Sequence, residues 1–173
     1  EGMVPPSLWD LPALQELDLS GNELHLDRSY VFGDIGNAKN LLKADLSSND
    51  IQKFTGIGAS KSLQELYIDD AYFFSSLDEE VYQMTQLRIL HMQYSGLKGK
   101  IPDGFSRMTG LKAFNFYGNE LTGTIPTEIG LMPNLWHIGE WFGVHDVLVY
   151  LIVITMLTFI AVITSLPFRL FRE

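Results

Sequence analysis

A short apolar pattern recurs along most of this chain and constrains the fold more than any other feature. Its first copy places leucines at the first, fourth and sixth positions: Leu14, Leu17 and Leu19. Four further copies, at spacings of 27, 22, 24 and 24 residues, begin at Leu41, Leu63, Leu87 and Leu111. Because one unit of this length cannot bury its own apolar face, five in a row predict a solenoid in which neighbouring coils cover one another.

Each copy is also expected to contain one short strand. Side chains alternate across a strand, so Leu17 and Leu19 point into the core while Asp18 between them points outward. Successive coils repeat the same path, which predicts a sheet of short parallel strands on one side of an α/β solenoid. The convex side is expected to be irregular or 3-10 helical.

An asparagine follows the strand in three copies, at Asn22, Asn49 and Asn119. An amide side chain offers both donors and an acceptor, so these residues are expected to bond buried backbone groups between coils. Ala71 and Ser95 take the equivalent positions in the middle copies. The third copy, which continues AYFF at 71–74, is therefore expected to disturb the stacking locally.

Three copies carry a further motif: GMVP at 2–5, GKIP at 99–102 and GTIP at 123–126. With the apolar pattern, this motif resembles the plant-type leucine-rich repeat of receptor-like proteins and kinases and of protease- or glycanase-inhibiting proteins. The resemblance covers roughly residues 2–140 and implies a leucine-rich-repeat domain over 1–140, with five full repeats and a partial one at each end. It also implies recognition of proteins, peptides or small ligands on the strand-lined face. Because 2–5 reads as the second half of a repeat, we expect further sequence upstream.

A second kind of segment follows the repeats. Residues 147–166 read VLVYLIVITMLTFIAVITSL and contain no charge. A helix of 20 residues spans about 30 Å, the hydrocarbon thickness of a bilayer, so a transmembrane helix is predicted after a juxtamembrane stretch at 141–146. The short tail at 167–173 contains Arg169 and Arg172, which by the positive-inside rule face the cytoplasm or stroma. This prediction makes the protein single-pass, in contact with the lipid bilayer, with its repeats on the lumenal or extracytoplasmic side. The alternative is the opposite orientation, a cytosolic repeat module held by a C-terminal tail anchor.

The amino-acid composition narrows the partners and the cellular compartment expected for this chain. Residues 1–146 contain 10 Lys and Arg against 20 Asp and Glu, a balance that disfavours nucleic acid as a partner. The chain has no cysteine and no Asn-x-Ser/Thr sequon. Both absences favour an organellar setting, such as a thylakoid membrane, over a disulfide-capped and glycosylated cell-surface domain.

Candidate contact residues come from the outward positions of the predicted strands and of the turns that follow them. Aromatic side chains are enriched at binding hot spots, and the acidic ones would suit a basic partner loop or calcium. The predicted partner-binding set is Asp18, Asp45, Tyr67, Asp69, His91, Tyr94, Tyr117 and Trp141. No calcium-loop spacing accompanies the acidic residues, so a solvated face is the simpler interpretation for them.

An enzyme is not expected. The four histidines, His25, His91, His137 and His145, are scattered, without a metal pair, nucleophile motif or phosphate loop around them. No cofactor is expected in the repeats themselves. If the chain joins a photosynthetic or haem-containing complex, His137 or His145 could bind pigment or haem through a ring nitrogen.

Two functional classes remain at this stage. The first is an accessory or scaffolding subunit that stabilises a larger membrane complex through its repeat face and its helix. The second is a receptor-like ectodomain that binds a peptide or protein ligand at a cell surface. The missing cysteines, the missing sequons and the very short tail favour the accessory subunit over the receptor-like ectodomain.

Overall fold

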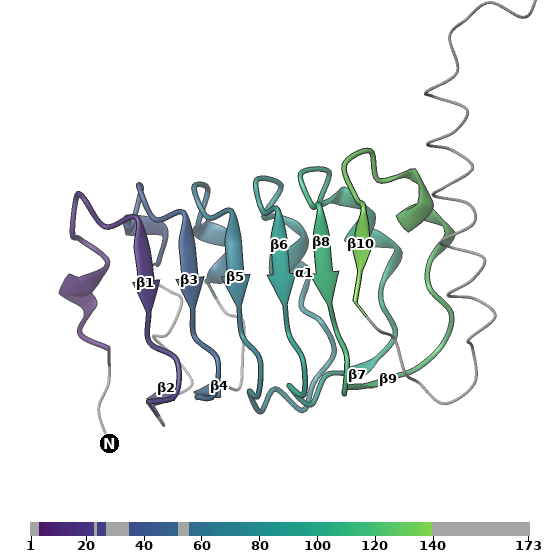
Figure 1. The fold of residues 1–173 in the computed structure, drawn as a ribbon, viewed down its shortest axis with the longest axis horizontal. Helices are drawn as coiled ribbons and strands as arrows, with labels where there is room; N and C mark the ends of the chain where they lie inside the picture. Colours follow the sequence, from purple (N-terminus) through teal and green to yellow (C-terminus); the bar gives the residue numbers. More distant parts are fainter. Residues whose placement is uncertain (1–3, 23, 27–34, 52–55, 140–173) are drawn as a thin grey trace, which may run out of the picture.

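The computed structural model describes residues 4–22, 24–26, 35–51 and 56–139, and these form a row of stacked coils whose strands lie side by side (Figure 1). The main sheet has six parallel strands in the order β1-β3-β5-β6-β8-β10. Their bounds are β1 (Glu16–Asp18), β3 (Lys43–Asp45), β5 (Glu65–Tyr67), β6 (Ile89–His91), β8 (Ala113–Asn115) and β10 (His137–Ile138). The predicted parallel sheet is thus confirmed, with one strand from each coil.

The opposite side of the solenoid consists of short helical turns, as predicted. Most are 3-10 helices: η1 (Pro6–Leu8), η2 (Ile35–Asn37), η3 (Ile57–Ala59), η4 (Asp103–Arg107) and η5 (Thr127–Leu131). The third coil has instead one turn of α-helix, α1 (Glu79–Tyr82). Asp78 caps this turn by accepting a hydrogen bond from the Glu80 backbone N–H, which satisfies one of the free donors of a helix start.

Two smaller ladders lie beyond the main strands and were not predicted. The first pairs β2 (His25–Leu26) with β4 (Asp50–Ile51), and the second pairs β7 (Lys98–Gly99) with β9 (Glu120–Leu121). Between them, the AYFF segment at 71–74 forms no strand, and Phe74 adopts a positive φ of 44°. The expected disturbance in the third copy therefore interrupts the secondary ladder, while the main sheet continues through β5.

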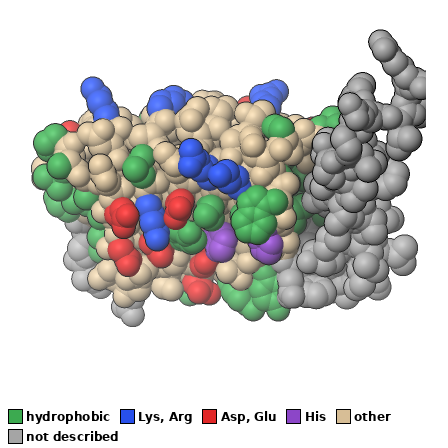
Figure 2. Space-filling model, turned by 45° about the horizontal axis from the view of Figure 1, so that its top comes forward, with side chains coloured by type: hydrophobic (Ala, Val, Ile, Leu, Met, Phe, Trp, Pro, Cys, Tyr) green, Lys and Arg blue, Asp and Glu red, His purple; other side chains and the backbone are tan. Residues whose placement is uncertain are grey.

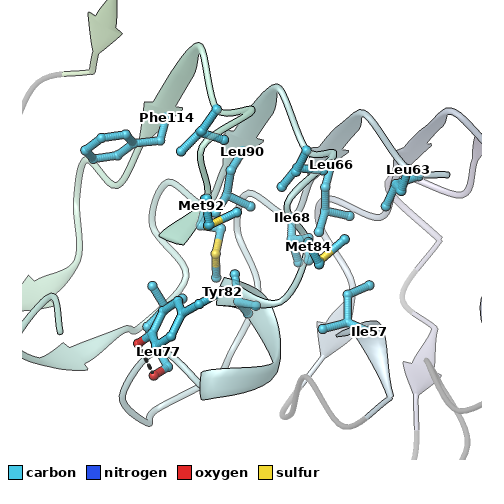
Figure 3. Packing of buried hydrophobic residues seen from close by; sticks show 14 of the residues in the cluster. Ile57, Leu63, Leu66, Ile68, Leu77, Tyr82, Met84, Leu90, Met92 and Phe114 are labelled. Carbon is cyan, nitrogen blue, oxygen red and sulfur yellow. Dashed lines mark hydrogen bonds between the residues drawn. The ribbon is translucent and has the colours of Figure 1, made fainter. Parts of the chain in front are cut away.

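Inward leucines and aromatic residues fill the space between the sheet and the convex turns. Leu66 and Leu90 on adjacent strands are fully buried, and so are Ile57 and Met84 from the convex side (Figure 3). Tyr82 is buried among them, and its hydroxyl donates to the Leu77 carbonyl oxygen at 2.9 Å. Each coil contributes one layer of this core and depends on its neighbours to close it.

The asparagine ladder is confirmed for two of the three residues. Asn49 donates to the Leu19 carbonyl oxygen of the preceding coil at 2.9 Å and accepts from the Leu24 N–H at 2.8 Å. Asn119 likewise donates to the Met92 carbonyl oxygen of the coil before it at 2.6 Å. Asn22, by contrast, is exposed and donates within its own coil, to Leu19 and Ser20.

Ser95 partly replaces the missing asparagine of its coil. It is fully buried, and its hydroxyl donates to the Ile68 carbonyl oxygen of the preceding coil at 2.6 Å. A serine can thus keep the inter-coil bond that Asn49 and Asn119 make, although it lacks their second donor.

In the described part of the chain, no helix has the length and apolar character needed to span a bilayer. The predicted span at 147–166 lies outside the described residues, as do the juxtamembrane stretch and the basic tail.

Candidate functional site

The outward positions of the main sheet align in register into one column of side chains. Asp18 pairs with Asp45, Asp45 with Tyr67, and Tyr67 with His91. Asn115 continues the column after His91. Adjacent strands lie about 4.8 Å apart, so four of the predicted contact residues are immediate neighbours on one surface.

A second outward column, two residues earlier on each strand, was missed by the sequence analysis. It runs through Glu16, Lys43, Glu65, Ile89, Ala113 and His137. Extending the period-two alternation back by one step from Asp18 would have found it. The candidate surface is therefore two side chains wide along the strands.

The two columns interact around Tyr67. The Tyr67 hydroxyl donates to Glu65 Oε2 at 3.2 Å, and the Lys43 ammonium lies 5.4 Å from the centre of the Tyr67 ring. Lys43 and Glu65 form an ion pair at 4.0 Å. The Tyr67 ring meets the His91 ring edge-on, with centroids 5.1 Å apart. Partial burial and the nearby Glu65 carboxylate raise the pKa of Tyr67, so the phenol stays protonated at neutral pH.

The two acidic residues of the first column are committed to local backbone bonds. Asp18 accepts from the Ser20 N–H at 2.9 Å and from the Ser20 hydroxyl at 2.6 Å. These bonds lower the pKa of Asp18 and hold its carboxylate ionised. Asp45 accepts from the Ser47 N–H at 3.0 Å in the same manner. Each carboxylate therefore stabilises the turn after its strand.

Asp69 is placed differently, because it bonds the next coil. Its Oδ1 accepts from the Gln93 N–H at 2.6 Å, and its own N–H donates to the Ser47 hydroxyl at 3.1 Å. Burial raises the pKa of Asp69, although the Gln93 hydrogen bond and the charge of His91 oppose that shift. Asp69 is therefore a half-buried residue whose hydrogen bonds to Ser47 and Gln93 connect three coils.

Tyr94 and Tyr117 form an aromatic pair beyond the strands. Their rings meet edge-on with centroids 5.2 Å apart, and hydrogen bonding to Tyr117 raises the pKa of Tyr94. Tyr94 is 54% exposed. The prediction that these tyrosines present aromatic surface on adjacent coils is consistent with this geometry.

The remaining predicted site residues belong to the last strand and to the segment after it. His137 lies on β10, exposed and in register with Ala113, with the Trp136 ring 5.6 Å away. His137 is thus a residue of the strand face. Trp141 and His145, the remaining predicted site residues, lie outside the described residues.

Charge is distributed unevenly along this face. Figure 2 shows the acidic side chains gathered toward one end, with the histidines and two neighbouring basic side chains toward the other. The acidic end carries Asp18 and Asp45, whereas exposed Arg88 and Lys112 precede β6 and β8. A ligand lying along the sheet would meet negative potential first and then positive potential.

Among the described residues, no three His, Asp or Glu side chains come together as a candidate metal site. Asp18 and Asp45 point their bonded oxygens at backbone donors, which is the structural role of a turn residue rather than that of a metal ligand. The geometry instead offers a shallow polar and aromatic surface suited to contact with another polypeptide.

Comparison with known proteins agrees with this architecture. Residues 13–36 match the Leucine Rich Repeat family model. The described residues share the leucine-rich-repeat fold. It resembles plant receptor-like proteins: it is 31% identical over 133 residues to Receptor-like protein 41 of Arabidopsis thaliana, covering 72% of this chain and 14% of that protein. This chain therefore corresponds to a small part of the full length of that relative.

Solved structures show the same fold. The plant peptide hormone receptor RGFR1, in complex with RGF2, is 29% identical with a TM-score of 0.68, covering 80% of this chain and 22% of that chain. The leucine-rich-repeat protein LIC12759 of Leptospira interrogans is 26% identical with a TM-score of 0.71, covering 90% and 38%. The repeat architecture is thus shared by plant and bacterial proteins, and function must be argued from the surface.

Proposed function

We propose that this chain is a membrane-anchored, receptor-like module that binds a peptide or protein ligand along its strand face and catalyses no reaction itself. The observation that carries the proposal is the in-register column from Asp18 through Tyr67 to His91. A flat parallel sheet fixes these side chains at regular spacing, so an extended polypeptide could contact several coils at once without reordering them.

The comparisons support a receptor-like role more than an accessory-subunit role. The matches include a receptor-like protein and a peptide hormone receptor in complex with its ligand. The accessory-subunit interpretation, including a thylakoid setting and pigment contact by His137 or His145, stays a prediction based on composition. It differs in one testable respect: a subunit co-purifies with a fixed stoichiometric complex, whereas a receptor-like module binds its ligand reversibly.

Membrane anchoring by residues 147–166 is part of the proposal and rests on the sequence. The uncharged 20-residue stretch and the following Arg169 and Arg172 support a single span with the repeats on the extracytoplasmic or lumenal side. Protease added from the tail side is expected to leave the repeats intact. Their digestion from that side would reverse the proposed orientation.

The binding proposal is tested by purifying the tagged full chain in mild detergent and identifying what co-purifies. The test variant combines Asp45→Ala, Tyr67→Ala and His91→Ala on the strand face. The matched control combines Ser106→Ala, Arg107→Ala and Glu128→Ala on the convex turns. We expect a peptide or protein that is retained by the control and lost by the strand-face variant. Loss from the control alone, or equal retention by both, would contradict the proposed face.

A further inference from the structure

A group of exposed aromatic residues lies beside the strand face, at the interruption of the secondary ladder. We define the aromatic edge as Tyr72, Phe74, Tyr94 and Tyr117. Tyr72, Phe74 and Tyr94 are 56%, 62% and 54% exposed. Figure 2 shows hydrophobic side chains at the lower edge of this face, next to acidic ones. Three such exposed rings on two successive coils exceed what folding requires of a surface.

The rings of the aromatic edge are held in place from below. Tyr72 and Phe74 stack with centroids 6.0 Å apart, and Tyr94 meets Tyr117 at 5.2 Å. Tyr94 lies directly against Gly118, where a Cβ would clash with its ring at less than van der Waals distance. The Phe74 ring lies over Gly96 at ordinary contact distance, 3.5 Å from where a Cβ would stand. A partner would therefore meet preorganised rings and lose little side-chain entropy there.

The charge around these rings favours a cation. The negative charge of Asp70 acts on Tyr94, and Asp69 and Asp70 act on each other. Residues 1–85, which include Tyr72 and Phe74, contain 5 Lys and Arg against 15 Asp and Glu. Aromatic faces carry negative electrostatic potential, so rings flanked by carboxylates attract a guanidinium more strongly than either group would alone.

The chain already contains the contact that such a partner would make. The Lys98 ammonium lies 5.7 Å from the centre of the Phe74 ring while it pairs with Glu120 at 3.3 Å. Lys43 makes the same contact with Tyr67 on the strand face. Phe74 thus accepts a cation in the free protein, and an incoming arginine would compete with Lys98 for it.

From these observations we infer that the aromatic edge is a second docking surface, distinct from the Asp18–His91 column, and that it binds an arginine-rich segment of a partner protein. Guanidinium groups would stack on Phe74 and Tyr94 while Asp69 and Asp70 supply the complementary charge.

The test uses the full chain in detergent and tetra-arginine amide as the probe, with binding measured by calorimetry. The Phe74→Leu/Tyr94→Leu variant keeps apolar bulk on Gly96 and Gly118 but removes both rings. Two cation–π contacts of about 0.5–1 kcal/mol each correspond to about tenfold in affinity, so we expect Kd to rise by about that factor. Lys98→Ala is expected to lower Kd, whereas Lys39→Ala, remote from the rings, is the matched control for removing a positive charge.

Two further variants distinguish binding at the aromatic edge from nonspecific attraction of the cationic probe to an acidic protein. Trp136→Ala removes an exposed ring elsewhere, and Asp18→Asn/Asp45→Asn removes acidic charge from the strand face. We expect both to leave Kd within about threefold of wild type, since distant surface charges are screened at physiological salt. An unchanged Kd in Phe74→Leu/Tyr94→Leu, or no binding by wild type at millimolar probe, would overturn the inference. If the double variant fails to fold, ring-proton shifts of Phe74 and Tyr94 in the wild type decide the question: shifts support the site and their absence refutes it.

Discussion

Replacement of Asn119 by alanine tests the inter-coil ladder that holds this solenoid together. Asn119 makes four hydrogen bonds of 3.0 Å or less: it donates to Met92 and Phe116 and accepts from Ser95 and Leu97. At about 1 kcal/mol each, their loss would cost about 4 kcal/mol. Asn119 is partly exposed, so water can satisfy some of the freed groups, and we expect a loss of about 3 kcal/mol.

Asn22→Ala is the matched control, because it makes the same chemical change at the same position of another repeat. Asn22 donates to two carbonyl oxygens of its own coil and is exposed, so its loss should cost under about 1 kcal/mol. The assay is urea unfolding of the full chain in detergent, followed by tryptophan fluorescence. A gap of about 2 kcal/mol between the two variants is expected from these bonds. Equal losses would refute the claim that bonds between coils, rather than turns within one coil, provide the stability.

The remaining predictions concern packing, charge and the membrane. Gly118→Ala should destabilise the fold by about 1–2 kcal/mol, because its φ is +72° and its Cβ would strike the Tyr94 ring; adding Tyr94→Ala should recover part of that loss. Burial raises the pKa of Asp69, so the ionised carboxylate opposes folding above that pKa. Asp69→Asn should therefore raise the free energy of unfolding at pH 7. This gain should shrink as the pH falls toward 4. The hydrogen bonds from Ser20 lower the pKa of Asp18, so the Asp18 carboxylate stabilises the fold at neutral pH and loses this effect as the pH falls through its folded pKa. Asp18→Asn should then lower the free energy of unfolding at pH 7. A gain in stability there would contradict the assigned bonds. The full chain should stay in the membrane pellet after alkaline carbonate washing, whereas a chain lacking residues 147–166 should be released.

The repeat pattern was sufficient to predict the main sheet and half of its outward surface. Leucines at fixed spacing determine which residues point inward, so the alignment of Asp45 with Tyr67 followed from counting. The bonds of Asn49 and Asn119 were also predictable, since an amide after each strand has few other places to donate. Asn22 differs because the described residues provide no carbonyl of a preceding coil within its reach.

Contacts that depend on the actual path of the loops could not be predicted. Phe74 is 62% exposed and adopts a positive φ, whereas the sequence predicted only a local disturbance of the stacking for its AYFF segment. The sequence favoured a solvated position for Asp69. The Gln93 N–H instead donates to its carboxylate, which gives Asp69 a structural role.

Site-specific photocrosslinking in intact cells tests most directly whether the strand face is where this protein meets its ligand. A benzoylphenylalanine at position 67 lies on the face between Asp45 and His91, and one at position 106 lies on the convex turn η4. A discrete crosslinked species formed from position 67 and absent from position 106 is the predicted result. Crosslinks of the same species from both positions, or from position 106 alone, would contradict the proposed binding face.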